Sequence, residues 1–514
     1  MKRITLILAV ISAILLASCA EPPVTGIPAE LREIMKAGRA IALPPPRPGF
    51  AEASASLLTP NLSAETDARI AEIVASTDPA GSMAHRHRIV GMPQLQAWLT
   101  HEEIAEEIYF LFDLLRYGYA GYQYFGGDDV FLPLRDSMLE RLASMDNPMR
   151  ASAYLNGLLV PSLRGTIMDN HFYIFTNGFG PPSYATLLSE DFVLRRSGGD
   201  LVTEIDGRTY RLVETTLRDG APAQGVLPTL TREGEFAFAF GLFAPLADPL
   251  AREIIAHLEC TRSGERHTRG VHLARPGNYT PMSRPLLATR EAGGVLVVES
   301  RSMLAPANNF ENARADFYQS GGDARGKPAL VLDLRGNYGG SRLLGSDWIR
   351  GYAGQPPSSD LAFAGHSLLS RTAMRRLNAN AIFEWEEDEV ETAWAQHGGF
   401  CDSAKLEPLP NDGLVIVLMD NTLFSAGELF IGYLRQLENV LFVGTNTRGV
   451  LLTGGISRTR LPRSGFDVSF GFNLNLRPDL SRFEGVGFLP DLWVPPRESL
   501  ERVLAFIERY GLNR

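Results

Sequence analysis

The stretch GLVIVLMDNTLFSAGELFIGYLRQLENVLFVGT, residues 413–445, has the pattern of two strands separated by a helix. GLVIVLMD and VLFVGT are short apolar runs, typical of strands that a parallel sheet buries on both faces. Strands separated by helices imply parallel βαβ units, with functional groups at the carboxyl ends of the strands. The stretch therefore predicts an α/β domain in which Ser425 lies at the open edge of the sheet, at the start of a helix.

The same α/β pattern extends to both sides of this unit. Upstream, GVLVVES (294–300) and PALVLDLRG (328–336) are further apolar runs of strand type. Downstream, apolar residues alternate strictly from Phe466 to Leu476, which indicates a strand with one buried face. The chain closes with a predicted helix near Glu498 to Tyr510. We therefore assign residues 281–514 to one α/β domain.

The remaining chain divides into three further parts, as expected for a chain of 514 residues, which exceeds what one hydrophobic core supports. Residues 20–95 are rich in Pro, Ala and Ser and predict a tether with one short helix. Residues 96–170 carry apolar residues at spacings of three and four and predict a small helical domain. Residues 171–280 contain short strand patterns and turns with glycine, such as residues 205–208, and predict a β-rich module.

The N-terminus, residues 1–19, has the layout of a secretory signal. Lys2 and Arg3 precede an apolar run from Ile4 to Leu16, which is too short to span a bilayer. Its end, Leu16-Ala17-Ser18-Cys19, resembles the bacterial lipobox, in which the cysteine is acylated before cleavage. The alternative is a plain signal peptide with a cysteine by chance.

The lipobox resemblance implies a membrane partner and a place in the bacterial cell envelope. Acyl chains on Cys19 would hold the mature chain on a membrane surface, on its periplasmic or outward side. Residue 20 is alanine, and the aspartate that retains many such proteins in the inner membrane is absent, which favours the outer membrane.

Composition narrows the remaining partners and cofactors. Hydrophobic residues make up 45% and charged residues 21% of the chain, which is ordinary for a globular protein. The formal net charge of −10 argues against a nucleic-acid partner. No CxxC pair and no histidine pair at metal spacing occurs, so we expect no metal and no cofactor. Cys260 and Cys401 either pair in an oxidising compartment or remain as free thiols. The oligomeric state is left open.

Ser425 has two chemical advantages for acyl transfer. The start of a helix offers unpaired backbone N–H groups and a positive dipole end, and both suit a developing oxyanion. The edge of the sheet also leaves the hydroxyl accessible to a substrate. The alternative interpretation is a helix N-cap, a role that serine often has at this position.

Four motifs that occur in order place Ser425 in a wider pattern. They are PALVLDLRGNYGGS (328–341), FSAGE (424–428), VGTNTRG (443–449) and EGVGFLPDLWV (484–494). Together they resemble the catalytic domain of the C-terminal processing, or tail-specific, serine peptidases, over residues 284–496. The resemblance implies a ClpP/crotonase-like α/β fold, a polypeptide substrate and Ser425 as nucleophile. It further implies an oxyanion hole formed by the Ala426 N–H and by Gly339 or Gly340, because glycine lets bare backbone approach a substrate.

The lysine base of the main family is missing. In that family it follows the Thr-x-Gly motif directly, 25 residues after the serine, and this position is Val450 here. Valine cannot accept a proton, and the guanidinium of the neighbouring Arg448 stays protonated. A Ser–Lys dyad is therefore excluded.

A second branch of the family, represented by the tricorn protease core, uses serine, histidine and glutamate. By position, its histidine resembles His171 in MDNHFYIF (168–175), and its glutamate resembles Glu484, three residues before Gly487. Imidazole is a competent base near neutral pH, and a carboxylate can orient it. The branch has a second serine where this chain has Asn170. Taken singly, His171 is interpretable as an ordinary histidine and Glu484 as a loop carboxylate. Glu428 is interpreted as structural support.

Two functions from different classes follow. The first is a lipid-anchored serine endopeptidase with Ser425, His171 and Glu484 as its triad. The second is an inactive relative that binds a hydrophobic ligand or a protein partner. The β-rich module stands where tail-specific peptidases carry a PDZ domain, but it lacks a clear carboxylate-binding loop, so it is PDZ-like in placement only. A distance of about 4 Å or less between His171 Nε2 and Ser425 Oγ would favour the peptidase.

Overall fold

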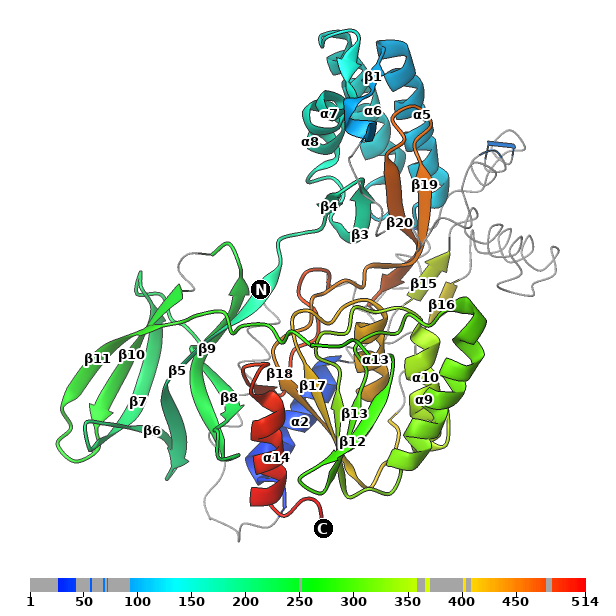
Figure 1. The fold of residues 1–514 in the computed structure, drawn as a ribbon. Helices are drawn as coiled ribbons and strands as arrows, with labels where there is room; N and C mark the ends of the chain where they lie inside the picture. Colours follow the sequence, from blue (N-terminus) through cyan, green and yellow to red (C-terminus); the bar gives the residue numbers. More distant parts are fainter. Residues whose placement is uncertain are drawn as a thin grey trace.

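The protein is a multidomain α/β chain, and the computed structural model in Figure 1 shows its three lobes. It describes residues 26–42, 56–57, 68–69, 72, 93–248, 252–357, 366–369, 401–403, 408–477 and 483–514. The lobe that carries Ser425 is built on a six-stranded sheet, in which β12 is antiparallel to β13 and the other pairs are parallel. In spatial order its strands are β12 (Ala288–Ala292), β13 (Val295–Glu299), β14 (Ala329–Asp333), β17 (Leu414–Met419), β18 (Val440–Gly444) and β21 (Leu492–Trp493).

Helices cover both faces of this sheet, as its continuous apolar strands require. One face packs against three helices: α9 (Phe310–Ala324), α10 (Arg342–Ala353) and α13 (Ala426–Leu434). The other face packs against α2 (Ala29–Ala42) and α14 (Ser499–Arg509). Alternate residues of β17 serve the two cores: Val415 and Val417 face the first group, and Leu414, Ile416 and Leu418 face the second. The predicted parallel α/β domain is confirmed.

A buried ion-pair network fixes the loop that follows β14. Arg301 donates to both oxygens of Asp333 at 2.6 Å, and Arg335 donates to the same carboxylate from the loop itself. Burial alone would raise the pKa of Asp333, but the hydrogen bonds and charges of Arg335 and Arg301 lower it to about 2. The network therefore stays ionised at neutral pH and holds the glycine-rich residues 336–340 in place beside β17.

The helical lobe contains the expected helices, with α5 (His101–Gly118) and α6 (Gly127–Ala143) as the longest. Two short strands form an antiparallel pair, β1 (Trp98–Leu99) before α5 and β2 (Met149–Arg150) after α6. Strand β2 leads into a short helical run formed by α7 (Ala151–Ala153), η3 (Tyr154–Leu159) and α8 (Val160–Leu163). Thr100 caps α5 in a reciprocal capping box with Glu103. The apolar spacing of α5 places Ile104, Ile108 and Leu111 in the buried core.

A second sheet attaches to the helical lobe and departs from the predicted domain boundaries. It contains β3 (Asp169–Ile174), β4 (Asn177–Phe179), β15 (His366–Leu369), β16 (Cys401–Ser403), β19 (Thr453–Arg460) and β20 (Asp467–Leu476). β20 is the strand predicted from strict alternation. Its Val468 and Phe470 pack in the helical core, and its Leu474 and Leu476 pack in a smaller cluster with Leu452, rather than in the core of the α/β domain. Strands β3 and β4 likewise lie outside the β-rich module. The predicted boundary at 171 therefore cuts through the β3–β4 hairpin, and the β19–β20 hairpin, which lies within the predicted α/β domain, packs with the helical lobe.

The β-rich module is a bent, antiparallel sheet of seven strands. Strand β5 (Tyr184–Ser197) pairs with β9 in its first part and with β6 in its last, so it links the two halves around one core. Asp206 and Gly207 both have positive φ in the two-residue hairpin turn that the sequence predicts. The described residues of this module form no α-helix, so its likeness to a PDZ domain remains one of placement. The other strands are β6 (Asp200–Ile205), β7 (Arg208–Leu217), β8 (Val226–Leu230), β9 (Phe236–Pro245), β10 (Glu253–Cys260) and β11 (Arg266–His272).

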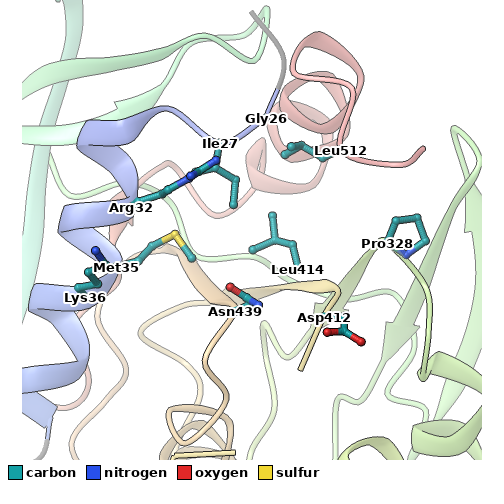
Figure 2. Close-up of a pocket in the computed structure, with 10 residues that line it drawn as sticks. All are labelled: Gly26, Ile27, Arg32, Met35, Lys36, Pro328, Asp412, Leu414, Asn439 and Leu512. Atoms are coloured by element: carbon teal, nitrogen blue, oxygen red, sulfur yellow. The ribbon is translucent and has the colours of Figure 1, made fainter. Parts of the chain in front are cut away.

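Helix α2 lies inside the predicted tether but is part of the folded body. Leu31, Ile34 and Met35 are buried in the same core as β14 and β17. Glu30 pairs with Arg196 of the β-rich module. A cavity of about 380 Å³ lies between α2, the C-terminus and the amino ends of the sheet strands, lined by Arg32, Met35 and Leu414 among others (Figure 2). The tether prediction is therefore wrong for residues 29–42.

Two further expectations meet the structure only in part. The lipobox and Cys19 lie outside the described residues. Among the helices that are described, none combines the length and apolar character needed to cross a membrane. Cys260 is buried as a free thiol, and β16 is described at Cys401 only by its backbone.

Candidate active site

Ser425 lies at the carboxyl edge of the parallel sheet. Strand β17 ends at Met419, a short loop follows, and α13 begins at Ala426. Ser425 itself has φ 56° and ψ −126°, a conformation that is rare for a residue with a side chain. Gly339 allows this arrangement, because a Cβ atom there would lie 2.9 Å from the Cβ of Ser425. The serine is therefore held in a tight turn with a strained backbone, a feature that clusters at active sites.

His171 reaches Ser425 from the other lobe. It lies on β3 of the second sheet, 254 residues earlier in the chain, and its Nε2 is 3.1 Å from Ser425 Oγ. This distance lies within hydrogen-bond reach and within the 4 Å that the sequence analysis set for the peptidase. The structure thus brings together the predicted nucleophile and the predicted base.

Burial sets the protonation state of His171. Burial lowers the pKa of its imidazole below the usual 6.5, and the charge of Asp169 and the backbone of Thr453 oppose this effect only in part. The neutral imidazole therefore predominates at physiological pH and can accept a proton through Nε2. Its Nδ1 atom is buried and makes no well-formed hydrogen bond within the described structure.

Glu484 lies near this histidine but does not hold its ring. Its two carboxylate oxygens accept hydrogen bonds from the backbone N–H groups of Asn170, Leu451 and Leu452, each at 2.8 Å. Among the hydrogen bonds of the described residues, none joins Glu484 to His171. Burial, followed by the charge of Asp169, raises the pKa of Glu484 to about 8 against the lowering effect of these N–H groups. Glu484 connects β3 to the loop at 451–452, and its predicted contact with the imidazole is absent.

Asn170 does not form the relay that a serine provides in the tricorn-type branch. Its side-chain amide donates to the carbonyl oxygen of Gly449 at 3.0 Å, while its backbone N–H donates to Glu484. The first contact joins the strand that carries His171 to the glycine of the Thr-x-Gly motif, and the second joins it to Glu484.

The N–H groups predicted for the oxyanion hole differ in availability. The Gly339 N–H donates to Asn337 Oδ1 at 2.9 Å and is therefore occupied. For Gly340 and Ala426, no backbone N–H hydrogen bond is found among the described residues. Gly340 has φ 139° and lies in the same loop as Gly339, and Ala426 is the first residue of α13. Of the two glycines, Gly340 is therefore the one that retains a free donor.

Glu428 holds the backbone around Ser425 through hydrogen bonds. Its carboxylate accepts hydrogen bonds from the N–H groups of Ser425, Gly449 and Val450 and from the hydroxyl of Thr447. Burial raises the pKa of Glu428 to about 7, although these four donors lower it. Val450 thus occupies the lysine position of the main family with its backbone bound to Glu428. The interpretation of Glu428 as structural support agrees with these contacts.

Replacing Glu428 with glutamine is expected to destabilise the protein by about 1–3 kcal/mol, because the new NH₂ group would face backbone donors that now share a carboxylate. Urea denaturation at neutral pH measures this loss. Glu501→Gln, at an exposed position on α14, is the matched control and should stay within about 0.5 kcal/mol of wild type. Equal stability of Glu428→Gln and wild type would show that the four donors find other partners.

The part of the chain that carries Ser425 is similar to a known family. Residues 295–494 match the family model described as peptidase family S41. This region resembles peptidase family S41. The matched residues make up less than half of the 514-residue chain, and they contain Ser425, Gly339, Gly340 and Glu484 but not His171. No curated protein matches the chain.

Three solved structures align with most of this chain at low identity. Mature CPAF is 16% identical and aligns over 80% of this chain and 96% of its own, with a TM-score of 0.37. The photosystem II D1 C-terminal processing protease is 16% identical and aligns over 81% of this chain and 100% of its own, with a TM-score of 0.35. The tricorn protease is 13% identical over 80% and 37%, with a TM-score of 0.34. These likenesses are too loose to support an argument. The family match and the contact between Ser425 and His171 support a serine-type peptidase.

The described residues contain no group of three or more metal-ligating side chains. One residue of the site was missed by the sequence analysis. Asp169 is fully buried two positions before His171, and its Oδ1 accepts a hydrogen bond from the His171 backbone N–H at 2.9 Å. Its place in MDNHFYIF, two residues before the histidine, was the available signal.

Proposed function

We propose that the protein is a lipid-anchored serine endopeptidase that hydrolyses polypeptides of the bacterial cell envelope. The observation that carries this proposal is the 3.1 Å contact between His171 Nε2 and Ser425 Oγ, formed by residues from two lobes. Two neutral side chains that merely cap or fill space have no need to meet at the edge of a parallel sheet, with free N–H groups beside them.

The reaction follows from the positions of these groups. Ser425 Oγ attacks the scissile carbonyl carbon while its proton passes to His171 Nε2, and the carbonyl π electrons move to the oxygen. The N–H groups of Ala426 and Gly340 would donate to this oxyanion. His171 then gives the proton to the leaving amine, the C–N bond breaks, and water repeats the sequence on the acyl-serine.

The proposed role of Glu484 differs from the one expected from the sequence. Its three backbone donors connect Asn170, the neighbour of His171, to the loop at 451–452. Glu484 would thus set the position of β3 relative to the α/β lobe, and so the distance between base and nucleophile. The alternative of an inactive ligand-binding relative gains no support from the cavity in Figure 2, which lies at the opposite edge of the sheet.

A fluorophosphonate probe tests the enzymatic part. The detergent-solubilised full chain should become labelled at Ser425, identified by peptide mass spectrometry, and should cleave unfolded polypeptides. A folded chain that resists the probe over the whole pH range from 5 to 9 would remove the basis for a peptidase and turn attention to ligand binding.

The lipid anchor has its own test. Cys19→Ser is expected to abolish incorporation of labelled palmitate and to move the protein from the membrane fraction to the soluble fraction, because several acyl chains are needed for stable anchoring. Cys260→Ser is the matched control, since this thiol is buried, and it should remain membrane-bound and labelled. Equal palmitate labelling of wild type and Cys19→Ser would contradict the anchor.

A further inference from the structure

His171 lies next to a second buried carboxylate, Asp169, to which the proposed triad assigns no role. Asp169 is 0% exposed, and its three hydrogen-bond donors are all neutral: the His171 N–H, the Tyr119 hydroxyl and the Thr453 hydroxyl. No ion pair of Asp169 occurs among the described residues. A buried carboxylate without a cation is costly, so such groups usually serve a purpose.

We propose that Asp169 is the positioning residue of His171, in place of the predicted Glu484. The proposal rests on the proposed function, since it assigns a role within the same site. The imidazolium that forms when Ser425 loses its proton would be the cation that Asp169 otherwise lacks. Asp169 would therefore act mainly in the transition state, where charge develops, and little in the resting enzyme.

The contacts of Asp169 hold it rigidly for this task. Its Oδ2 accepts from Tyr119 at 2.9 Å and from Thr453 at 2.7 Å, and its Oδ1 accepts from the main chain of His171. Tyr119 follows directly after α5, and Thr453 is the first residue of β19. The carboxylate is thus fixed by the helical lobe and by the hairpin, and it fixes β3 in turn. By contrast, every hydrogen bond of Glu484 among the described residues comes from a backbone N–H group, of Asn170, Leu451 or Leu452.

The charges around His171 agree with this assignment. The charge of Asp169 raises the pKa of His171 against the larger effect of burial, and Glu484 is not among the causes of that shift. The other titratable groups that face Asp169 are Glu484, whose pKa its charge raises, and Tyr119, whose pKa burial and the same charge raise. Burial and the charge of Asp169 thus favour the neutral forms of both neighbours.

The test is the pKa of His171, measured by NMR on the detergent-solubilised full chain with labelled histidines and assigned with His171→Gln. In Asp169→Asn the pKa of His171 should fall by about 1 unit or more, as expected for the loss of an opposite charge at short range. The rate of fluorophosphonate labelling should fall about 10²- to 10⁴-fold, with kcat for peptides lowered and KM nearly unchanged. Glu484→Gln is the matched carboxylate-to-amide control and should shift the pKa of His171 by less.

The outcomes distinguish a positioning role of Asp169 from a role in stabilising the fold alone. An unchanged pKa of His171 in folded Asp169→Asn would overturn the proposal, even if the variant loses activity. A lowered pKa in a protein that no probe labels would keep the positioning role and refute the peptidase instead. If Asp169→Asn does not fold, ¹⁵N shifts of wild type decide. The base role of His171, on which the proposal rests, requires its resting proton on Nδ1, and a resting proton on Nε2 would contradict both this base role and the role of Asp169.

Discussion

Replacing Ser425 with alanine is expected to abolish fluorophosphonate labelling and to lower kcat for peptide hydrolysis by about 10³- to 10⁶-fold. The nucleophilic oxygen is lost, and water can use only the remaining N–H donors of Gly340 and Ala426. The fold should survive, because the backbone of residue 425 keeps its hydrogen bond to Glu428. Labelling followed by mass spectrometry and steady-state kinetics measure both effects.

Ser341→Ala is the matched control for this variant. Ser341 also stands at a helix N-cap in the same lobe, where its Oγ accepts from Leu343 N–H at the start of α10. Its loss should cost about 1 kcal/mol of stability and leave labelling intact. Full labelling of Ser425→Ala would locate the reactive group elsewhere and refute the proposed nucleophile.

Replacing His171 with alanine is expected to reduce the labelling rate about as strongly as the loss of Ser425, because groups that act as a unit fail together. In wild type, burial lowers the pKa of His171, so the labelling rate should rise with pH through a midpoint below 6.5 and then level off. In His171→Ala this rise should disappear. His101→Ala, at the start of α5, is the control and should keep the wild-type profile.

The lowered pKa of His171 also determines whether its contribution to folding stability rises or falls with pH. Between the folded pKa of His171 and about 6.5 the unfolded chain binds more protons than the folded chain, so the contribution of His171 to stability rises with pH over this window. Denaturant unfolding of wild type minus His171→Ala should therefore show a difference that grows from pH 5 to 7. A difference that shrinks with pH would mean that the folded pKa is raised, contrary to the burial of this side chain.

The sequence predicted most of the α/β lobe and the contact between Ser425 and His171. Apolar runs such as residues 414–419 suit a sheet covered on both faces, and the residues of this run are divided between the two cores. His171 was found by resemblance, since nothing local in MDNHFYIF indicates a partner 254 residues away.

What the sequence could not supply was the set of contacts of the buried carboxylates. Glu484 was expected on the imidazole, yet its oxygens accept from three backbone N–H groups, which only loop conformation places there. Similarly, the alternation of β20 predicts a strand with one buried face but not which core receives that face. In the structure Phe466, Val468 and Phe470 enter the helical core, because Gly118 of α5 leaves room for the ring of Phe470.

Because α2 is packed into the folded body, only a short segment separates this body from Cys19. The Gly26 N–H donates to Tyr510 O, and α2 is buried directly afterwards, so the folded body begins 26 − 19 = 7 residues after Cys19. Seven extended residues reach at most about 25 Å. With the proposed lipid on Cys19, the amino ends of the sheet strands must therefore stay close to the bilayer. Ser425 lies at the carboxyl ends of the same strands, so the enzyme would stand with its catalytic face turned away from the lipid and open to polypeptides in the aqueous space.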